Sequence, residues 1–259
     1  MSDYEKTLNF WEQNSIKGNV YGSFLISDDN LGNYRLKWEQ RYLDKIIKHF
    51  FLSKNNLKIL DVGCGTGNFV DFFSGYGSVI GFDFSKNSID YCRSRFKNIK
   101  GVSFSVGNIL DFDIKEKFDL IFVGGVLMYI EDKDINKAIE NLANLLSKDG
   151  IIIFREATMS RRTITTYEGK EYVMPCFRRE LHEYEKKFQL HNLNVKKIIP
   201  NFVCTYTTLI SQYRRILNIN INLFKNKIVE LFFLYIPFKI FLLFRKNMYT
   251  YHFIIVNKL

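Results

Sequence analysis

Apolar runs with the length of single strands alternate with helical segments from residue 57 onward. Five such runs occur before residue 157: LKILDV (57–62), SVIGFD (78–83), VSFSVG (102–107), FDLIFVG (118–124) and IIIFRE (151–156). Helical spacing of apolar residues fills the intervals 67–75, 86–97 and 133–147. A helix over 178–190 and strands over 194–200 and 248–257 complete the pattern. This alternation predicts an α/β fold with a mostly parallel seven-stranded sheet, helices on both faces and right-handed crossovers.

Two stretches fall outside the alternation. Residues 1–52 begin with mixed, aromatic sequence and continue into a segment with apolar positions at helical spacing, which predicts an N-terminal cap and helix. Residues 204–247 separate the last two strands and are long for a connection inside a domain. We expect a helical apolar and basic insertion there, with 53–203 and 248–259 forming the core.

The most apolar part of this insertion is 228–244. Glu230, Pro237 and Lys239 interrupt it, and its length is below the roughly 20 residues that a bilayer span requires. We therefore expect no transmembrane helix.

Composition and charge limit the number of domains, the cellular compartment and the kind of partner that we expect. The chain has 259 residues, 47% of them hydrophobic, which suits one large domain. Its four cysteines lack the spacing of a metal site or of disulfide pairs, and its first residues contain no signal peptide, so we expect a cytoplasmic protein without structural zinc. Residues 1–154 hold 19 Lys and Arg against 20 Asp and Glu, whereas residues 155–259 hold 18 against 7. The surplus predicts an anionic partner, and compositional drift explains it as well.

The segment ILDVGCGTGNF (59–69) carries the chemistry. Gly63, Gly65 and Gly67 follow an apolar strand, where glycine permits positive φ and leaves room for a ligand at the strand's carboxyl end. Asp83 ends the second strand, where a carboxylate can accept hydrogen bonds from a ribose diol. A dinucleotide loop requires G-x-G-x-x-G, but Asn68 stands at its third glycine position, so the spacing argues against a nicotinamide or flavin dinucleotide.

The loop LDVGCGTGNF is followed by GFDFS, GNILDF, FDLIFVGGVLMYI and a fifth strand after KDG. This ordered set resembles the motifs of class I S-adenosylmethionine-dependent methyltransferases over about residues 57–156. The resemblance implies a Rossmann-like fold, S-adenosylmethionine as the cofactor, and a cofactor site built from Asp61, Gly63, Gly65, Gly67, Asp83, Phe84, Asn108, Ile109 and Gly124. Asp61 and the three glycines would border the methionine portion, Asp83 the ribose, and Phe84, Asn108 and Ile109 the adenine.

Structural explanations remain open for several of these residues. Asp83 could cap the following helix, although Ser85 suits that position better. Phe84 and Ile109 could be ordinary core residues.

Candidates for the acceptor side are less specific. Tyr129 stands where the resemblance places a substrate contact, and its ordinary pKa near 10 favours orientation of the acceptor over proton removal. Glu156 ends the fifth strand and His182 lies on the following helix, so either could accept a proton. From the cap, Tyr21 and Arg35 are suited to close over the cofactor. Each of these residues could instead have an ordinary packing or surface role.

Two arginine pairs complete the candidates. Arg161 with Arg162, and Arg178 with Arg179, could surround the mouth of the site and bind phosphate or carboxylate, or could be solvated surface charges.

These features predict a methyltransferase acting on an O or N atom of a small anionic acceptor, such as a phosphorylated metabolite, an amine phosphate or a nucleotide-linked sugar. An alternative acceptor is a lipid or quinone-like precursor, with residues 228–246 contacting a membrane surface. A third hypothesis is a non-catalytic scaffold whose insertion forms a homodimer or partner surface. Nucleic acid is not expected as a partner, because neither a recognition module nor an N-P-P-Y or paired-Cys motif is present.

Overall fold

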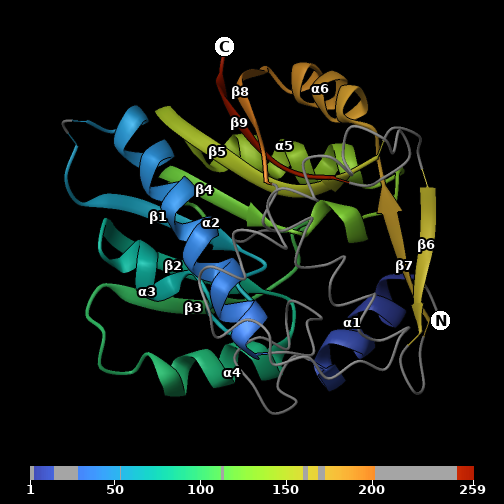
Figure 1. Ribbon diagram of the computed structural model, residues 1–259, viewed down its shortest axis with the longest axis horizontal. Helices are drawn as coiled ribbons and strands as arrows, with labels where there is room; N and C mark the ends of the chain where they lie inside the picture. Colours follow the sequence, from blue (N-terminus) through green and yellow to red (C-terminus); the bar gives the residue numbers. More distant parts are fainter. Residues whose placement is uncertain are drawn as a thin grey trace, which may run out of the picture.

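The computed structural model describes residues 3–14, 29–52, 54–111, 114–159, 163–168, 173–201 and 250–259. Within these residues a seven-stranded sheet has the order β3-β2-β1-β4-β5-β9-β8 (Figure 1). Its strands are β1 (Leu57–Val62), β2 (Gly77–Asp83), β3 (Val102–Val106), β4 (Phe118–Gly124), β5 (Leu146–Thr158), β8 (Leu193–Pro200) and β9 (Thr250–Lys258). The first five pair in parallel, and β9 is antiparallel to both neighbours. The predicted fold class is confirmed.

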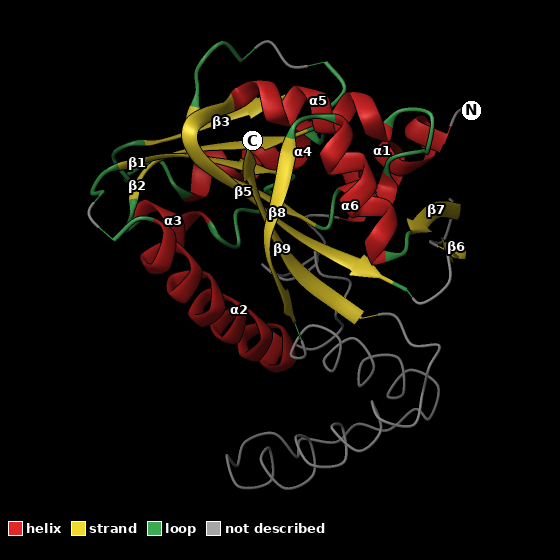
Figure 2. Ribbon diagram, turned by 90° about the horizontal axis from the view of Figure 1, so that it is seen from above, coloured by secondary structure: helices red, strands yellow, loops and turns green. Residues whose placement is uncertain are grey.

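Helices cover both faces of this sheet, as the front and top views show (Figures 1 and 2). One face packs on α2 (Asp29–Phe50) and α3 (Val70–Ser74), and the other packs on α5 (Ile135–Leu145) and α6 (Leu181–Leu190). Neighbouring β1 residues Ile59 and Leu60 belong to opposite cores because successive strand side chains alternate between faces. The apolar runs in the sequence therefore reflect strands buried on both sides.

Several element boundaries differ from those predicted. The helix expected over 133–147 ends at Leu145, because β5 begins at Leu146, which is fully buried and pairs with Phe118. The helix expected from 178 begins at Leu181, because a capping box between Glu180 and Glu183 starts it there.

A two-stranded antiparallel sheet between β5 and α6 was not predicted. It consists of β6 (Thr163–Glu168) and β7 (Val173–Arg178). The β-branched residues of TITTYE are a strand signal that could have revealed it.

The N-terminal region contains α1 (Asp3–Asn14) as well as α2. Tyr21, Arg161, Arg162 and the insertion over 204–247 lie outside the described residues, so the predictions about them stay predictions. Among the residues that the structure does describe, no helix is both long and apolar enough to cross a membrane.

Candidate active site

The glycine loop after β1 depends on backbone conformations that suit glycine. Gly63, Gly65 and Gly67 have φ values of 69°, 53° and 78°. A Cβ at Gly63 would lie 2.3 Å from a Val126 methyl group, and one at Gly67 would lie 2.4 Å from the Phe96 ring. Gly63 and Gly65 line a pocket, whereas Gly67 provides room for packing between the loop and the following helices.

Asp83, at the end of β2, holds this loop. One of its carboxylate oxygens accepts from Gly65 N–H at 2.8 Å and the other accepts from Ser85 N–H at 2.9 Å. Burial raises the pKa of Asp83 to about 6. Ser85 accepts from Ser88 N–H and is the N-cap of α4 (Lys86–Arg95), so the capping role falls to Ser85 as expected.

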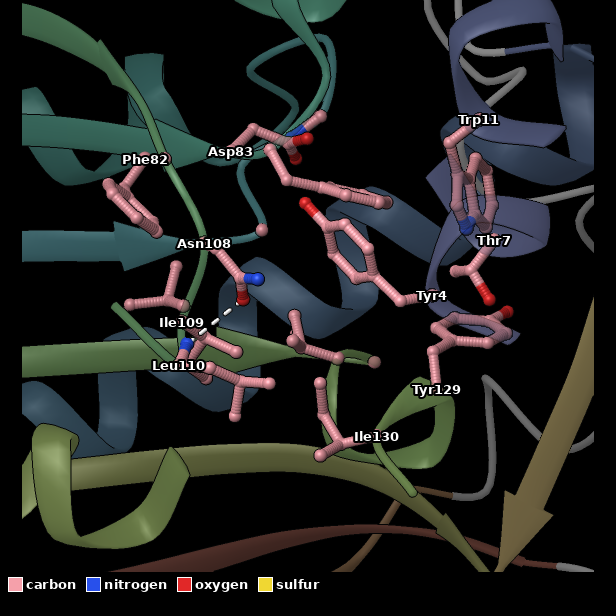
Figure 3. Close-up of a pocket in the computed structure, with 18 of the residues that line it drawn as sticks. Tyr4, Thr7, Trp11, Phe82, Asp83, Asn108, Ile109, Leu110, Tyr129 and Ile130 are labelled. Atoms are coloured by element: carbon pink, nitrogen blue, oxygen red, sulfur yellow. Dashed lines mark hydrogen bonds between the residues drawn. The ribbon is translucent and has the colours of Figure 1, made fainter. Parts of the chain in front are cut away.

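The pocket opens at the carboxyl ends of the central strands and is bounded on the far side by α1 (Figure 3). It has a volume of about 990 Å³ with its open mouth included. Eight residues predicted from the sequence line it: Gly63, Gly65, Asp83, Phe84, Asn108, Ile109, Gly124 and Tyr129.

Asn108 presents the nitrogen end of its amide to this pocket. Its Oδ1 accepts from Leu110 N–H at 2.9 Å, and its NH₂ end points into the pocket toward Tyr4 (Figure 3). The side chain of Asn108 therefore offers N–H donors to the pocket.

Three α1 residues that line the pocket were not predicted as site residues. Tyr4, Thr7 and Trp11 point into it from one face of the helix (Figure 3), and their spacing of three and four residues is the signal that could have identified that face. The ring of Trp11 meets Tyr129 edge to face, with centroids 5.8 Å apart. The acceptor candidate Tyr129 thus lies against the N-terminal cap.

Glu156 is not placed as a proton acceptor for a substrate. Its side chain is fully buried beneath the turn that follows β4, and its carboxylate accepts from the N–H groups of Val126, Leu127 and Met128 at 2.9, 3.0 and 3.3 Å. Burial raises the pKa of Glu156 to about 7. His182 is exposed on α6, 3.4 Å from Glu180, and does not line the pocket. The structure therefore brings neither Glu156 nor His182 to the cavity.

Arg35 also lies away from the pocket lining. It is buried on α2 and pairs with Glu39 at 3.3 Å, and the same Glu39 oxygen accepts from Arg155 at 2.9 Å and from Asn201 at 2.7 Å. Arg35 therefore joins a buried network that ties α2 to the sheet, rather than closing over a cofactor.

Asp61 lies beneath the glycine loop on β1. It is 2% exposed, and its Oδ2 has no hydrogen-bond partner among the described residues. Burial, and then the nearby Asp83 carboxylate, raise the pKa of Asp61 to about 8. An unpartnered acidic oxygen at this position is suited to a ligand that brings positive charge or a hydrogen-bond donor.

The prediction that Arg178 and Arg179 line the mouth of the site is wrong. Their exposed fractions are 5% and 0%, and Arg179 donates to main-chain carbonyls. The described lining contains the carboxylates Asp83, Glu131 and Asp134 and no Lys, Arg or His. Among the described residues, the charged side chains that line the pocket are thus all acidic.

The glycine loop, the carboxylate after β2 and the pocket at the strand ends agree with the family comparison. A model of the methyltransferase domain matches residues 53–218, which is more than half of the chain. The chain belongs to this family, and the predicted class, the class I S-adenosylmethionine-dependent methyltransferases, is confirmed.

Relatives of this chain are named as different methyltransferases. The chain is 30% identical to a ubiquinone biosynthesis O-methyltransferase from Pelagibacter ubique over 56% of its own length and 64% of the relative's. It is 30% identical to phosphoethanolamine N-methyltransferase 1 from Arabidopsis thaliana over 51% of its own length and 27% of the relative's. It therefore spans less than two thirds of these relatives.

A solved structure shows the same fold. An O-methyltransferase from a trans-AT PKS multienzyme of Brevibacillus brevis, in complex with S-adenosyl-L-homocysteine, superposes with a TM-score of 0.56 at 18% identity. The match covers 86% of this chain and 77% of that one.

Proposed function

We propose that this chain binds S-adenosylmethionine in the pocket beside Asp83 and transfers its methyl group to an O or N atom of a small-molecule acceptor. The observation that carries the proposal is the Asp83 carboxylate, held by Gly65 N–H at the pocket wall. Further support comes from family membership and from the relatives, which are named as methyltransferases.

The residues present fit this cofactor. Asp83 would accept from the ribose hydroxyls, and Phe84, Asn108 and Ile109 would surround the adenine. Gly63 and Gly65 leave room for the methionine portion, and the unpartnered Oδ2 of Asp61 lies below it. When bound, the cofactor supplies a methyl group on a positively charged sulfur, and the acidic side chains of the site favour that charge.

On the acceptor side the chain would act mainly by positioning. Tyr129 and Trp11 form an aromatic wall that can orient an acceptor, and correct placement of two reactants accounts for a large part of the rate in such transfers. Tyr129 can also receive a hydrogen bond from the acceptor. Its role as a base is secondary, because a phenol has an ordinary pKa near 10.

The acidic lining argues for a neutral or cationic acceptor. A phosphate would meet Glu131 and Asp134 rather than the expected arginines, because Arg178 and Arg179 are buried elsewhere. An anionic acceptor would require cationic residues outside the described part of the chain. The relatives' names include both a phosphorylated amine and ubiquinone biosynthesis, so they do not choose between these acceptor classes.

Cofactor binding is tested by calorimetry with S-adenosylmethionine, S-adenosylhomocysteine and NAD. We expect the first two to bind and NAD not to bind, because the loop lacks the third glycine of a dinucleotide site. Binding of NAD alone would overturn the proposal.

Acceptor charge can be tested without knowing the acceptor. The protein is incubated with methyl-labelled S-adenosylmethionine and a protein-free cell extract, and the products are separated by organic extraction and ion exchange. Label in neutral or cationic products that stay in the aqueous phase supports the acidic lining as the determinant. Label in anionic products would restore the phosphorylated acceptor, and label in the organic phase would favour the lipid or quinone-like alternative. Cofactor binding without any labelled product would favour the scaffold.

A further inference from the structure

The turn after β4 depends on partners from outside itself. It covers residues 125–130 and contains η2 (Leu127–Tyr129), whose own backbone bonds join Tyr129 N–H to Val126 O at 2.9 Å and Ile130 N–H to Leu127 O at 3.2 Å. So short a helix leaves its first N–H groups and its last carbonyls without partners inside the helix. In a buried position each of these groups needs a partner from elsewhere in the fold.

Glu156 supplies the partners at the N–H end. One carboxylate oxygen accepts from Val126 and Leu127, and the other accepts from Met128. Bonds from backbone N–H groups to a buried carboxylate are stronger than bonds to a neutral acceptor.

Arg179 binds two carbonyls of the turn. Its Nη2 donates to Ile130 O, at the carbonyl end, at 2.6 Å, and its Nη1 donates to Leu127 O, which also accepts from Ile130 N–H, at 2.9 Å. Asp132, next to the turn, pairs with the same guanidinium at 2.8 Å. The planar group thus bridges the turn and the residues that follow it.

Glu156 and Arg179 are connected to each other through the backbone at the end of β5. Arg179 O accepts from Met159 N–H at 3.1 Å, and Met159 directly follows β5, the strand that carries Glu156. Glu156 on β5 and Arg179, which is bonded to the residue after β5, therefore hold the two ends of the turn. Within η2, Tyr129 is the residue whose side chain enters the pocket.

We infer that Glu156 and Arg179 are positioning residues that hold the 125–130 turn and so fix Tyr129 against the acceptor. This inference rests on the proposed function, because it takes Tyr129 as the acceptor contact. Neither Glu156 nor Arg179 lines the pocket itself; each acts through the backbone of the turn.

The test compares Glu156→Gln and Arg179→Lys in a Trp38→Phe background, where Trp11 is the remaining tryptophan. The amide of Gln would set its NH₂ against a backbone N–H group, and Lys lacks the second arm of the guanidinium fork. We expect acrylamide quenching of Trp11 to increase toward the level of Tyr129→Ala. Methyl transfer to the products that the wild type labels should fall about ten- to a hundredfold. The Kd for S-adenosylhomocysteine should change by less than about threefold.

Glu39→Gln is the matched control, because Glu39 is equally buried and also accepts three hydrogen bonds, from side chains outside the turn. It should leave Trp11 quenching and methyl transfer near the wild-type values. Unchanged quenching in both test variants would overturn the inference, as would an equal effect of Glu39→Gln. If the buried variants do not fold, Asp132→Asn removes the half-exposed partner of Arg179 and should raise quenching less, with no change counting against the inference. A wild-type protein that fails to bind S-adenosylhomocysteine would refute the proposed function, while Trp11 quenching would still report on the turn.

Discussion

The pocket wall that contains Gly63, Gly65 and Asp83 belongs to one continuous stretch of chain, whereas the opposite wall combines α1 with the turn after β4. The first wall obtains its shape from the backbone angles of its glycines and from a hydrogen bond between Gly65 and Asp83, which are 18 residues apart in the sequence. The second depends on Glu156 and Arg179, which lie 30 and 52 residues away from their bonded positions in the turn. A local motif can therefore specify the cofactor side, while the acceptor side requires correct long-range assembly.

The largest effect should come from one added methyl group on the first wall. Gly63→Ala combines a positive φ with a Cβ only 2.3 Å from Val126, so we expect a loss of about 2 to 5 kcal/mol in the free energy of unfolding and loss of cofactor binding. Urea denaturation and calorimetry measure both. Gly75→Ala is the control, because its φ is −70° and its nearest neighbour would lie 3.4 Å away. Equal behaviour of the two variants would show that the backbone conformation at Gly63 does not determine the shape of the first wall.

The next largest effect concerns the carboxylate on that wall. Asp83→Asn should weaken S-adenosylhomocysteine binding by about 1.5 to 3 kcal/mol through loss of charge-assisted hydrogen bonds. Because the pKa of Asp83 is about 6, wild-type affinity should also decrease as the pH falls below 6 and the carboxylate is protonated, whereas the variant should show less of this dependence. Calorimetry between pH 5 and pH 8 checks both expectations, with the exposed Asp90→Asn as control. An unchanged affinity would exclude Asp83 from the cofactor site.

A smaller effect should appear in stability rather than in binding. The pKa of Asp61 is raised from its ordinary value to about 8, so the folded state retains a proton that the unfolded chain loses from about pH 4 upward. The wild type should therefore lose stability relative to Asp61→Asn as the pH rises, by about 1 to 3 kcal/mol between pH 6 and pH 8. Urea denaturation of both proteins at the two pH values gives this difference. A constant difference would show that Asp61 does not titrate in this window.

Much of the fold was readable because its strands are buried on both faces. The predicted bounds of β1 and β4 agree with the structure, since each is a continuous apolar run. The β6–β7 sheet was missed because it lies outside this alternation and has no apolar run of that kind.

The same contrast applies to the site. The glycines and Asp83 were identified because their function depends on local spacing. Glu156 was a candidate because it ends the fifth strand, and Arg179 because it forms a pair with Arg178 in the sequence. Only the fold shows that both are buried against a turn. The α1 lining was missed because the sequence does not show where that helix docks.

A hydrogen bond joins the residue after β8 to β9. Asn201 N–H donates to Tyr251 O at 2.7 Å, and the Asn201 side chain donates to Glu39. The ends of β8 and β9 are therefore held together by the core itself. Because the entropy cost of joining two chain ends rises only slowly with the length of the connection, ends held in this way are compatible with connections of different lengths. Such a junction allows the connection to change during evolution while the strands that carry the cofactor site keep their positions.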